Sequence, residues 1–98
     1  MNAQSVAEIA TLKASRYLQQ LCKHWQHKLA VTFDPQNGRV AFSIGECRMQ
    51  AAPELLTLTV SAPDAEKLAQ LQEVVASHLL RFAFKDELKV EWREVAAS

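Results

Sequence analysis

Residues 14–29 read ASRYLQQLCKHWQHKL, and this stretch decides the fold because it makes one strongly amphipathic helix. At about 100° per residue, its apolar side chains fall within about one third of the helix circumference. The opposite side is polar and mostly basic. We therefore expect a helix that begins near Thr11 and packs one face against a core. That face consists of Ala14, Tyr17, Leu18, Leu21, Cys22, Trp25 and Leu29.

The segment before this helix does not continue its pattern. A capping box at Ser5-x-x-Glu8 is typical of a helix start. A helix that began there would, however, expose three apolar side chains on its outer side, namely Val6, Ile9 and Leu12. We therefore predict a short strand at residues 5–10.

Three strands are predicted after the helix. Residues 30–33 alternate in polarity, and the sequence DPQNG at 34–38 supplies turn chemistry. In residues 39–51 the apolar positions change phase at Gly45-Glu46. A period of two cannot change phase without an extra residue, so we expect one strand with a bulge or bend at that point. Residues 56–61 form the third strand.

A second helix follows, and it is predicted to open at Pro63 and Asp64. One of its faces is expected to be buried; it carries Leu68, Leu71, Val75, His78, Leu79 and Phe82. A last strand is predicted at residues 88–92, where Leu88, Val90 and Trp92 alternate with charged side chains.

The predicted order of elements is therefore β-α-β-β-β-α-β in a single domain of residues 1–98. Each strand has one apolar face, and two amphipathic helices are available to cover that face. The economical solution is an α+β two-layer sandwich with a mostly antiparallel sheet and both helices on one side. The open side of the sheet is rich in Ala, Thr and Ser and could receive a ligand or a second subunit.

Composition excludes several classes of protein. The chain has 22% charged and 49% apolar residues, which is ordinary for a soluble globular protein. Its formal net charge is zero, so no global field steers it to nucleic acid or to a membrane surface. No apolar run approaches the roughly 18 residues of a membrane span. Without a signal-peptide pattern we expect a cytoplasmic protein with reduced cysteines.

The outer face of the first helix carries a basic stripe, and no acidic residue occurs between Glu8 and Asp34. Such a stripe could bind a phosphate, a carboxylate-rich ligand or an acidic partner, or it could simply be a solvated face. Nucleic acid is not expected, because aromatic residues do not alternate with the basic ones. The stripe consists of Lys13, Arg16, Gln20, Lys23, His24 and His27.

A metal site would have to be assembled from distant parts of the chain. Cys22 points away from His24 and His27 on the helix, so these three cannot share an ion. The candidate set is His24 with His78 and Cys47, although none of their spacings matches a known metal motif. Both cysteines lie at positions where the pattern of their element places apolar side chains, so they could equally be core residues.

His78 allows two interpretations. It lies at the edge of the buried face of the second helix, where a histidine is usually satisfied by a backbone carbonyl or a carboxylate. It could instead be a pKa-tuned group in a cleft between the helices, near Tyr17 or His24. No nucleophile motif or phosphate loop is present, and Asp86-Glu87 is interpreted as a solvated turn, so we do not expect an enzyme.

Four stretches together resemble the small bacterial family classed as domain of unknown function 2218. They are SRYLQQLCKHWQHK, the turn with Phe33-Asp34 and Gly38, HLLRFAF at 78–84, and the closing Trp92. Members are sometimes labelled dihydroxyheptenedioate aldolase, but this chain is too short for the barrel that such chemistry uses elsewhere. The resemblance also implies a domain found beside or fused to siderophore-interacting reductases, which suggests a role near iron.

Two functional hypotheses remain. In the first, the chain is a binding or accessory module whose cleft between the helices receives an anionic chelate or a metal, in iron or siderophore handling. Its ligand-binding residues would be Arg16, Tyr17, His24, Trp25, Lys28, His78 and Arg81. The partner would be an anionic small molecule or a siderophore-interacting reductase; the sequence specifies no cofactor. In the second, the chain is a structural interaction domain, a homodimer with no small ligand.

Overall fold

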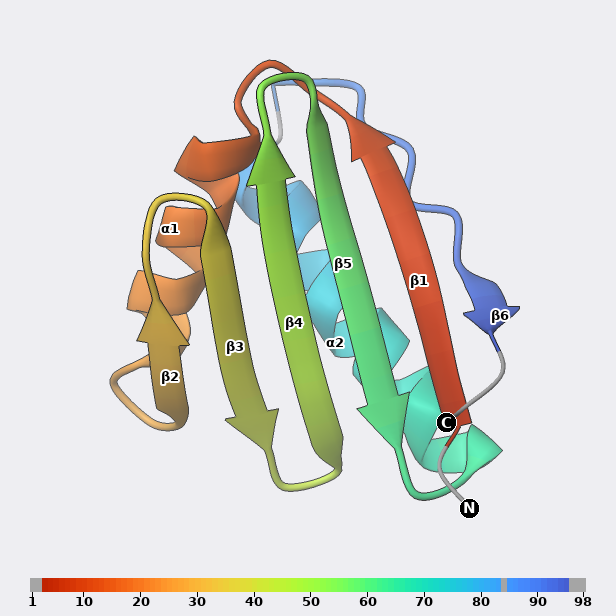
Figure 1. The fold of residues 1–98 in the computed structure, drawn as a ribbon. Coiled ribbons are helices and arrows are strands. Elements are labelled where there is room, and N and C mark those ends of the chain that lie inside the picture. Colours follow the sequence, from red (N-terminus) through yellow and green to blue (C-terminus); the bar gives the residue numbers. More distant parts are fainter. Residues whose placement is uncertain (1–2, 84, 96–98) are drawn as a thin grey trace.

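The computed structural model describes residues 3–83 and 85–95, and in these residues one six-stranded antiparallel sheet carries two helices on one face (Figure 1). The strand order across the sheet is β2-β3-β4-β5-β1-β6. The strands are β1 (Ala3–Ala10), β2 (Ala30–Phe33), β3 (Asn37–Phe42), β4 (Gly45–Ala52), β5 (Leu55–Ala62) and β6 (Arg93–Val95). The helices are α1 (Ala14–Trp25) and α2 (Ala65–Phe82). The prediction of an α+β two-layer sandwich is confirmed.

Both helices form where the sequence pattern places them, with small differences at their starts. Helix α1 begins at Ala14 instead of near Thr11. Residues 3–10 form a strand, so the apparent capping box at Ser5 and Glu8 does not start a helix. Helix α2 is capped by Asp64, whose carboxylate accepts a hydrogen bond of 2.8 Å from the backbone N–H of Lys67. This cap satisfies one of the free N–H groups of the first turn.

The predicted single strand at residues 39–51 is instead a hairpin, so the bulge at Gly45-Glu46 is wrong. Strands β3 and β4 pair antiparallel through a short turn at residues 43–44, with Phe42 opposite Gly45 and Val40 opposite Cys47. Each pair of facing residues in this hairpin joins an even-numbered residue to an odd-numbered one. The apolar phase therefore changes because the chain reverses direction, and no extra residue is needed.

The last strand is also displaced. Residues 88–92 form no ladder, and β6 begins only at Arg93, where it pairs with the first part of β1. The alternation in this segment is nevertheless meaningful, because Leu88, Val90 and Trp92 are half-buried and pack against the core. Alternating polarity indicates which way the side chains face, but it does not indicate whether the backbone pairs with a neighbouring strand.

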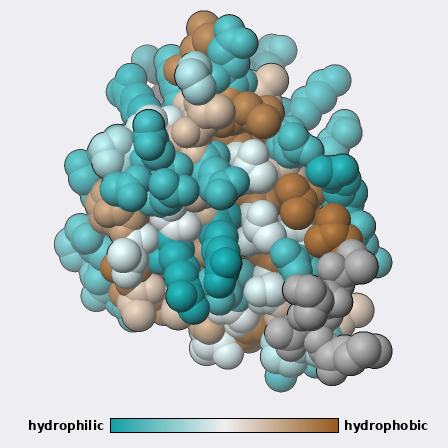
Figure 2. Space-filling model, in the orientation of Figure 1, coloured by the Kyte–Doolittle hydropathy of each residue, from teal (hydrophilic) through white to brown (hydrophobic). Residues whose placement is uncertain are grey.

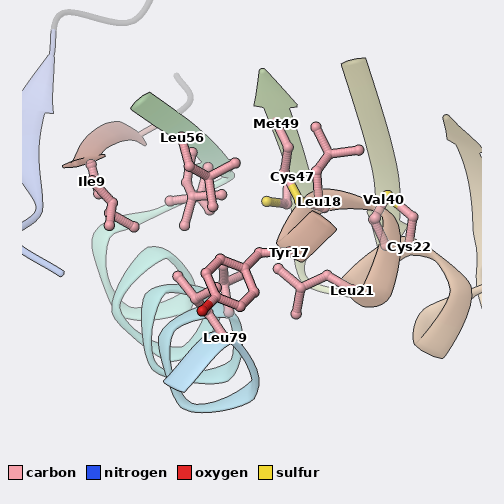
Figure 3. Packing of buried hydrophobic residues seen from close by; sticks show 14 of the residues in the cluster. Ile9, Tyr17, Leu18, Leu21, Cys22, Val40, Cys47, Met49, Leu56 and Leu79 are labelled. Carbon is pink, nitrogen blue, oxygen red and sulfur yellow. The ribbon is translucent and has the colours of Figure 1, made fainter. Parts of the chain in front are cut away.

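The core lies between the sheet and the two helices (Figure 3). Leu18 and Leu21 of α1, Leu79 of α2 and Leu56 of β5 are fully buried there. Among the described residues, the buried polar one is Ser5, whose Oγ accepts a hydrogen bond of 2.6 Å from Nε2 of Gln72 and so connects α2 to β1. Neither helix in the described residues is long and apolar enough to cross a membrane.

Candidate functional site

A pocket of about 270 Å³ lies between α1 and the segment that follows α2. One wall comes from successive turns of α1, and the other comes from the last turn of α2 and the residues beyond it. Three of its side chains are cationic and one is anionic. The lining residues are Lys13, Arg16, Tyr17, Gln20, Phe82, Ala83, Lys85 and Asp86.

Tyr17 forms the floor of this pocket. Its ring is buried in the core, with 4% of the residue exposed, and its hydroxyl points toward the end of α2 (Figure 3). The hydroxyl donates a hydrogen bond to Oδ2 of Asp86, and Nζ of Lys13 lies 3.5 Å from the same oxygen. The interpretation of Asp86 as a solvated turn residue is therefore wrong: this carboxylate anchors the chain after α2 to the face of α1.

Replacing Tyr17 with phenylalanine is expected to lower the free energy of unfolding by about 1–2 kcal/mol. A hydrogen bond to a charged group contributes about 1.5–3 kcal/mol, and water can partly replace the donor because the Asp86 side chain is 29% exposed. Urea unfolding of the wild type and the variant measures the change. In a double-mutant cycle with Asp86→Ala the two effects should not add; additive effects would show that the pair makes no stabilising contact.

An aromatic cluster continues the same helix interface beyond the pocket. The ring centroids of His24 and His78 are 5.2 Å apart, and those of Trp25 and His78 are 5.3 Å apart. Phe82 stands edge-on to His24 at 5.6 Å and also lines the pocket. Phe82 therefore links the pocket to the cluster.

The tautomer of His78 follows from its hydrogen bond. Its Nδ1 lies 2.7 Å from the backbone carbonyl oxygen of Val74, one turn earlier in α2. A carbonyl oxygen can only accept, so Nδ1 carries the proton, and in the neutral ring Nε2 is left as an acceptor. The backbone-satisfied histidine predicted from the sequence is confirmed for Nδ1, and Nε2 remains available.

The environment of His24 favours its neutral form. Partial desolvation of the ring, followed by the positive charge of its neighbours, lowers the pKa of His24 below its ordinary value of 6.5. At neutral pH this side chain is therefore an uncharged imidazole. The neighbours that act on it are His78, Arg81, Lys28 and His27.

The predicted site residues thus fall into two adjacent groups. Arg16 and Tyr17 line the pocket, while His24, Trp25 and His78 contact one another in the aromatic cluster. Lys28 and Arg81 are close enough to His24 to influence its charge. Trp25 is 6% exposed and belongs mainly to the core, so it does not floor an open cleft as predicted.

Cys47 is not brought to the two histidines. It is fully buried in the middle of β4, on the sheet face that packs against the helices, whereas His24 lies on the exposed side of α1. No group of three or more metal-ligating side chains occurs within residues 3–83 and 85–95. Burial raises the pKa of the Cys22 thiol to about 11 and also raises that of Cys47, so both remain protonated core residues.

The chain matches one protein family over almost its whole length. The family model described as "Uncharacterized protein conserved in bacteria (DUF2218)" matches residues 6–93. The chain belongs to this family. The fold is shared with PA4090 from Pseudomonas aeruginosa, whose structure was solved by NMR; the two are 36% identical, with a TM-score of 0.79, over 93% of this chain and 95% of that one. Among curated proteins none matches.

Sequence reasoning put Lys13 and Gln20 in the basic stripe but not among the site residues, and it gave no ligand-binding role to the other lining residues, Phe82, Ala83, Lys85 and Asp86. Lys13 and Gln20 are three or four residues from Arg16 and Tyr17 on the same helix, so helical spacing could have placed them in the site. Lys85 and Asp86 follow α2, and no local pattern indicates that this segment returns to α1. Only the tertiary structure shows that it does.

The open face of the sheet offers a second, wider depression of about 510 Å³, and Figure 2 shows hydrophilic side chains over much of this face. Its cations are already paired. Glu46 lies 2.8 Å from Nε of Arg39 and 2.7 Å from Nε of Arg48, and its hydrogen bond with Arg48 lowers its pKa. An incoming anion would have to compete with this carboxylate for both arginines, whereas Arg16 makes no ion pair with any described residue, so we place the candidate site between the helices.

Proposed function

We propose that this chain is a non-enzymatic binding module that holds a small anionic ligand in the pocket between α1 and the end of α2. The observation that carries the proposal is the charge of the pocket. Among the described lining residues, Lys13, Arg16 and Lys85 are cationic, and Asp86 supplies the carboxylate. Tyr17 and Lys13 already occupy one oxygen of that carboxylate, so it repels an incoming anion less than an unpaired acid would.

The other lining groups suit a compact ligand with oxygen atoms. A guanidinium such as that of Arg16 can bind a carboxylate or phosphate through two parallel hydrogen bonds. The amide of Gln20 can donate to a further oxygen, and the ring of Phe82 provides apolar contact area. The volume is slightly below the roughly 300 Å³ at which drug-sized ligand pockets begin. A di- or tricarboxylate or a single catecholate ring is therefore the class we propose.

The ligand class also suggests a role near iron. Carboxylates and catecholates are hard oxygen ligands of the kind used to chelate iron, and the family resemblance associates such domains with siderophore-interacting reductases. We therefore place the module in iron or siderophore handling, in the cytoplasm, with such a reductase as its partner. The two thiols support a non-enzymatic role, because burial keeps them protonated and withdraws them from nucleophilic chemistry.

A homodimer formed through the open sheet face is the second candidate. Small side chains at Thr57, Thr59 and Ser61 favour it, because they leave the surface of β5 smooth enough for close approach. The ion pairs of Glu46 with Arg39 and Arg48 disfavour it, since burying them would remove charged groups from water.

Calorimetric titration with citrate and with ferric citrate tests the proposal. The wild type should bind at least one of them saturably, and Arg16→Ala should weaken that binding about tenfold or more, because a charge-assisted hydrogen bond contributes about 1.5–3 kcal/mol. Lys67→Ala is the matched control: it removes the same charge from the first turn of α2, at the opposite end of that helix.

Two results would contradict the proposal. One is equal weakening by Arg16→Ala and Lys67→Ala, which would indicate unspecific attraction. The other is no binding of either compound together with a dimer in light scattering, which would favour the interaction domain.

A further inference from the structure

The two histidines at the helix interface have a geometry that the anion pocket does not explain. We infer that His24 of α1 and His78 of α2 together bind a divalent transition-metal ion of the zinc class. The ion would join the two helices and keep its remaining coordination positions open. The site is separate from the pocket proposed for the anion, and it does not depend on an anion being bound there.

The spacing of the rings carries the inference. Their centroids are 5.2 Å apart and the ring planes are inclined by 47°. With a Zn–N distance of about 2.0–2.1 Å, two imidazoles on one tetrahedral ion have their centroids about 5 Å apart. The observed separation of 5.2 Å between the two ring centroids matches this value.

The hydrogen bond of His78 is of the kind that orients metal ligands. Metal-bound histidines usually donate their second N–H to a carbonyl or carboxylate, and this bond sets the tautomer and the direction of the ring. In this chain Nδ1–H donates to the carbonyl of Val74, so Nε2 is the nitrogen left for the metal. Because the donor is held by the backbone of α2, the ligand is oriented before any ion arrives.

Aromatic neighbours restrict both rings further. The ring centroid of Trp25 lies 5.3 Å from that of His78 and 6.4 Å from that of His24, and the ring of Phe82 stands edge-on to His24. Trp25 is itself anchored on β3 through Phe42, at 5.1 Å. Both ligands therefore project from packed helices and not from loops, which is the arrangement that keeps a small site in shape.

Nearby cations determine what else the ion would carry. Arg81 and Lys28 act on His24 and oppose a bare cation. They would favour an ion whose open positions hold anionic oxygen donors, since these reduce its charge. Two imidazoles leave two such positions on a tetrahedral ion, so the ion would accept water or a carboxylate from solution.

The test is titration of the untagged protein with Zn²⁺ alone, followed by thermal shift, and with Co²⁺, followed by its visible absorption. We expect one saturable site per chain. His24→Ala and His78→Ala should each weaken binding tenfold or more. His27→Ala is the matched control, because it removes the third histidine, which lies in the turn after α1, and should leave the affinity unchanged.

A measurement on the wild type keeps the test decisive if a variant fails to fold. In nitrogen NMR spectra of the imidazoles, Zn²⁺ should shift Nε2 of His78 and leave Nδ1 protonated. The inference is overturned if no saturable binding occurs, if His27→Ala weakens binding as much as the other two variants, or if the His78 ring does not respond. If citrate binding depends on Arg16 but not on His24 while no saturable Zn²⁺ binding occurs, the anion pocket is supported and the metal site is contradicted.

Discussion

Replacing Trp25 with alanine is expected to lower the free energy of unfolding by about 3–5 kcal/mol, as for other buried tryptophans. Trp25 is 6% exposed and contacts Phe42 of β3 and His78 of α2. It therefore joins three elements at one point, and its removal leaves a cavity that none of them can fill alone. Guanidinium unfolding followed by circular dichroism measures the effect, since the tryptophan signal itself would change.

Trp25→Phe is the control for this experiment. It keeps an aromatic ring between the same neighbours and should recover a large part of the lost stability. The sequence predicted that Trp25 belongs to the ligand site. A Trp25→Ala variant that loses less than about 1 kcal/mol, a value typical of positions without a packing role, but no longer binds ligand would support that prediction and contradict the core assignment.

Gly45→Ala is expected to lower the free energy of unfolding by about 1–3 kcal/mol, because an added methyl group would overpack this position. A Cβ atom at this position would lie 2.2 Å from the carbonyl oxygen of Ser61 and 2.9 Å from Cδ2 of Leu71. The side chain of Leu71 can rotate, but the carbonyl belongs to the neighbouring strand β5. The backbone of the β3–β4 hairpin would have to shift, and thermal unfolding should show a clearly lower midpoint.

Ser43→Ala separates this steric effect from a general sensitivity of the turn. Ser43 is exposed in the same turn, and its substitution should change stability by no more than about 0.5 kcal/mol. A second comparison uses Leu71→Ala combined with Gly45→Ala. If the double variant were as stable as Leu71→Ala alone, the clash would lie with that side chain and the conflict with the β5 carbonyl would be disproved.

The candidate site illustrates what a sequence can indicate. Arg16 and His24 were found because they lie on the polar face of one amphipathic helix, and Tyr17 was found because it lies on the apolar face of the same helix. The meeting of His24 with His78 was only an alternative in the sequence, because it requires two helices to pack side by side. The position of Asp86 against Tyr17 was missed, since these residues are 69 positions apart and no local pattern connects them.

The sequence by itself determined the two helices, the apolar faces of the strands and hence the α+β sandwich, because periodicity records which side of each element is buried. Only the tertiary structure decided that residues 39–51 form a hairpin and that residues 88–92 run beside the sheet without pairing. It also decided that Cys47 stays away from the histidines and that the basic face of α1 meets Asp86. These features depend on which elements become neighbours in space, and side-chain periodicity along one element contains no information about its neighbours.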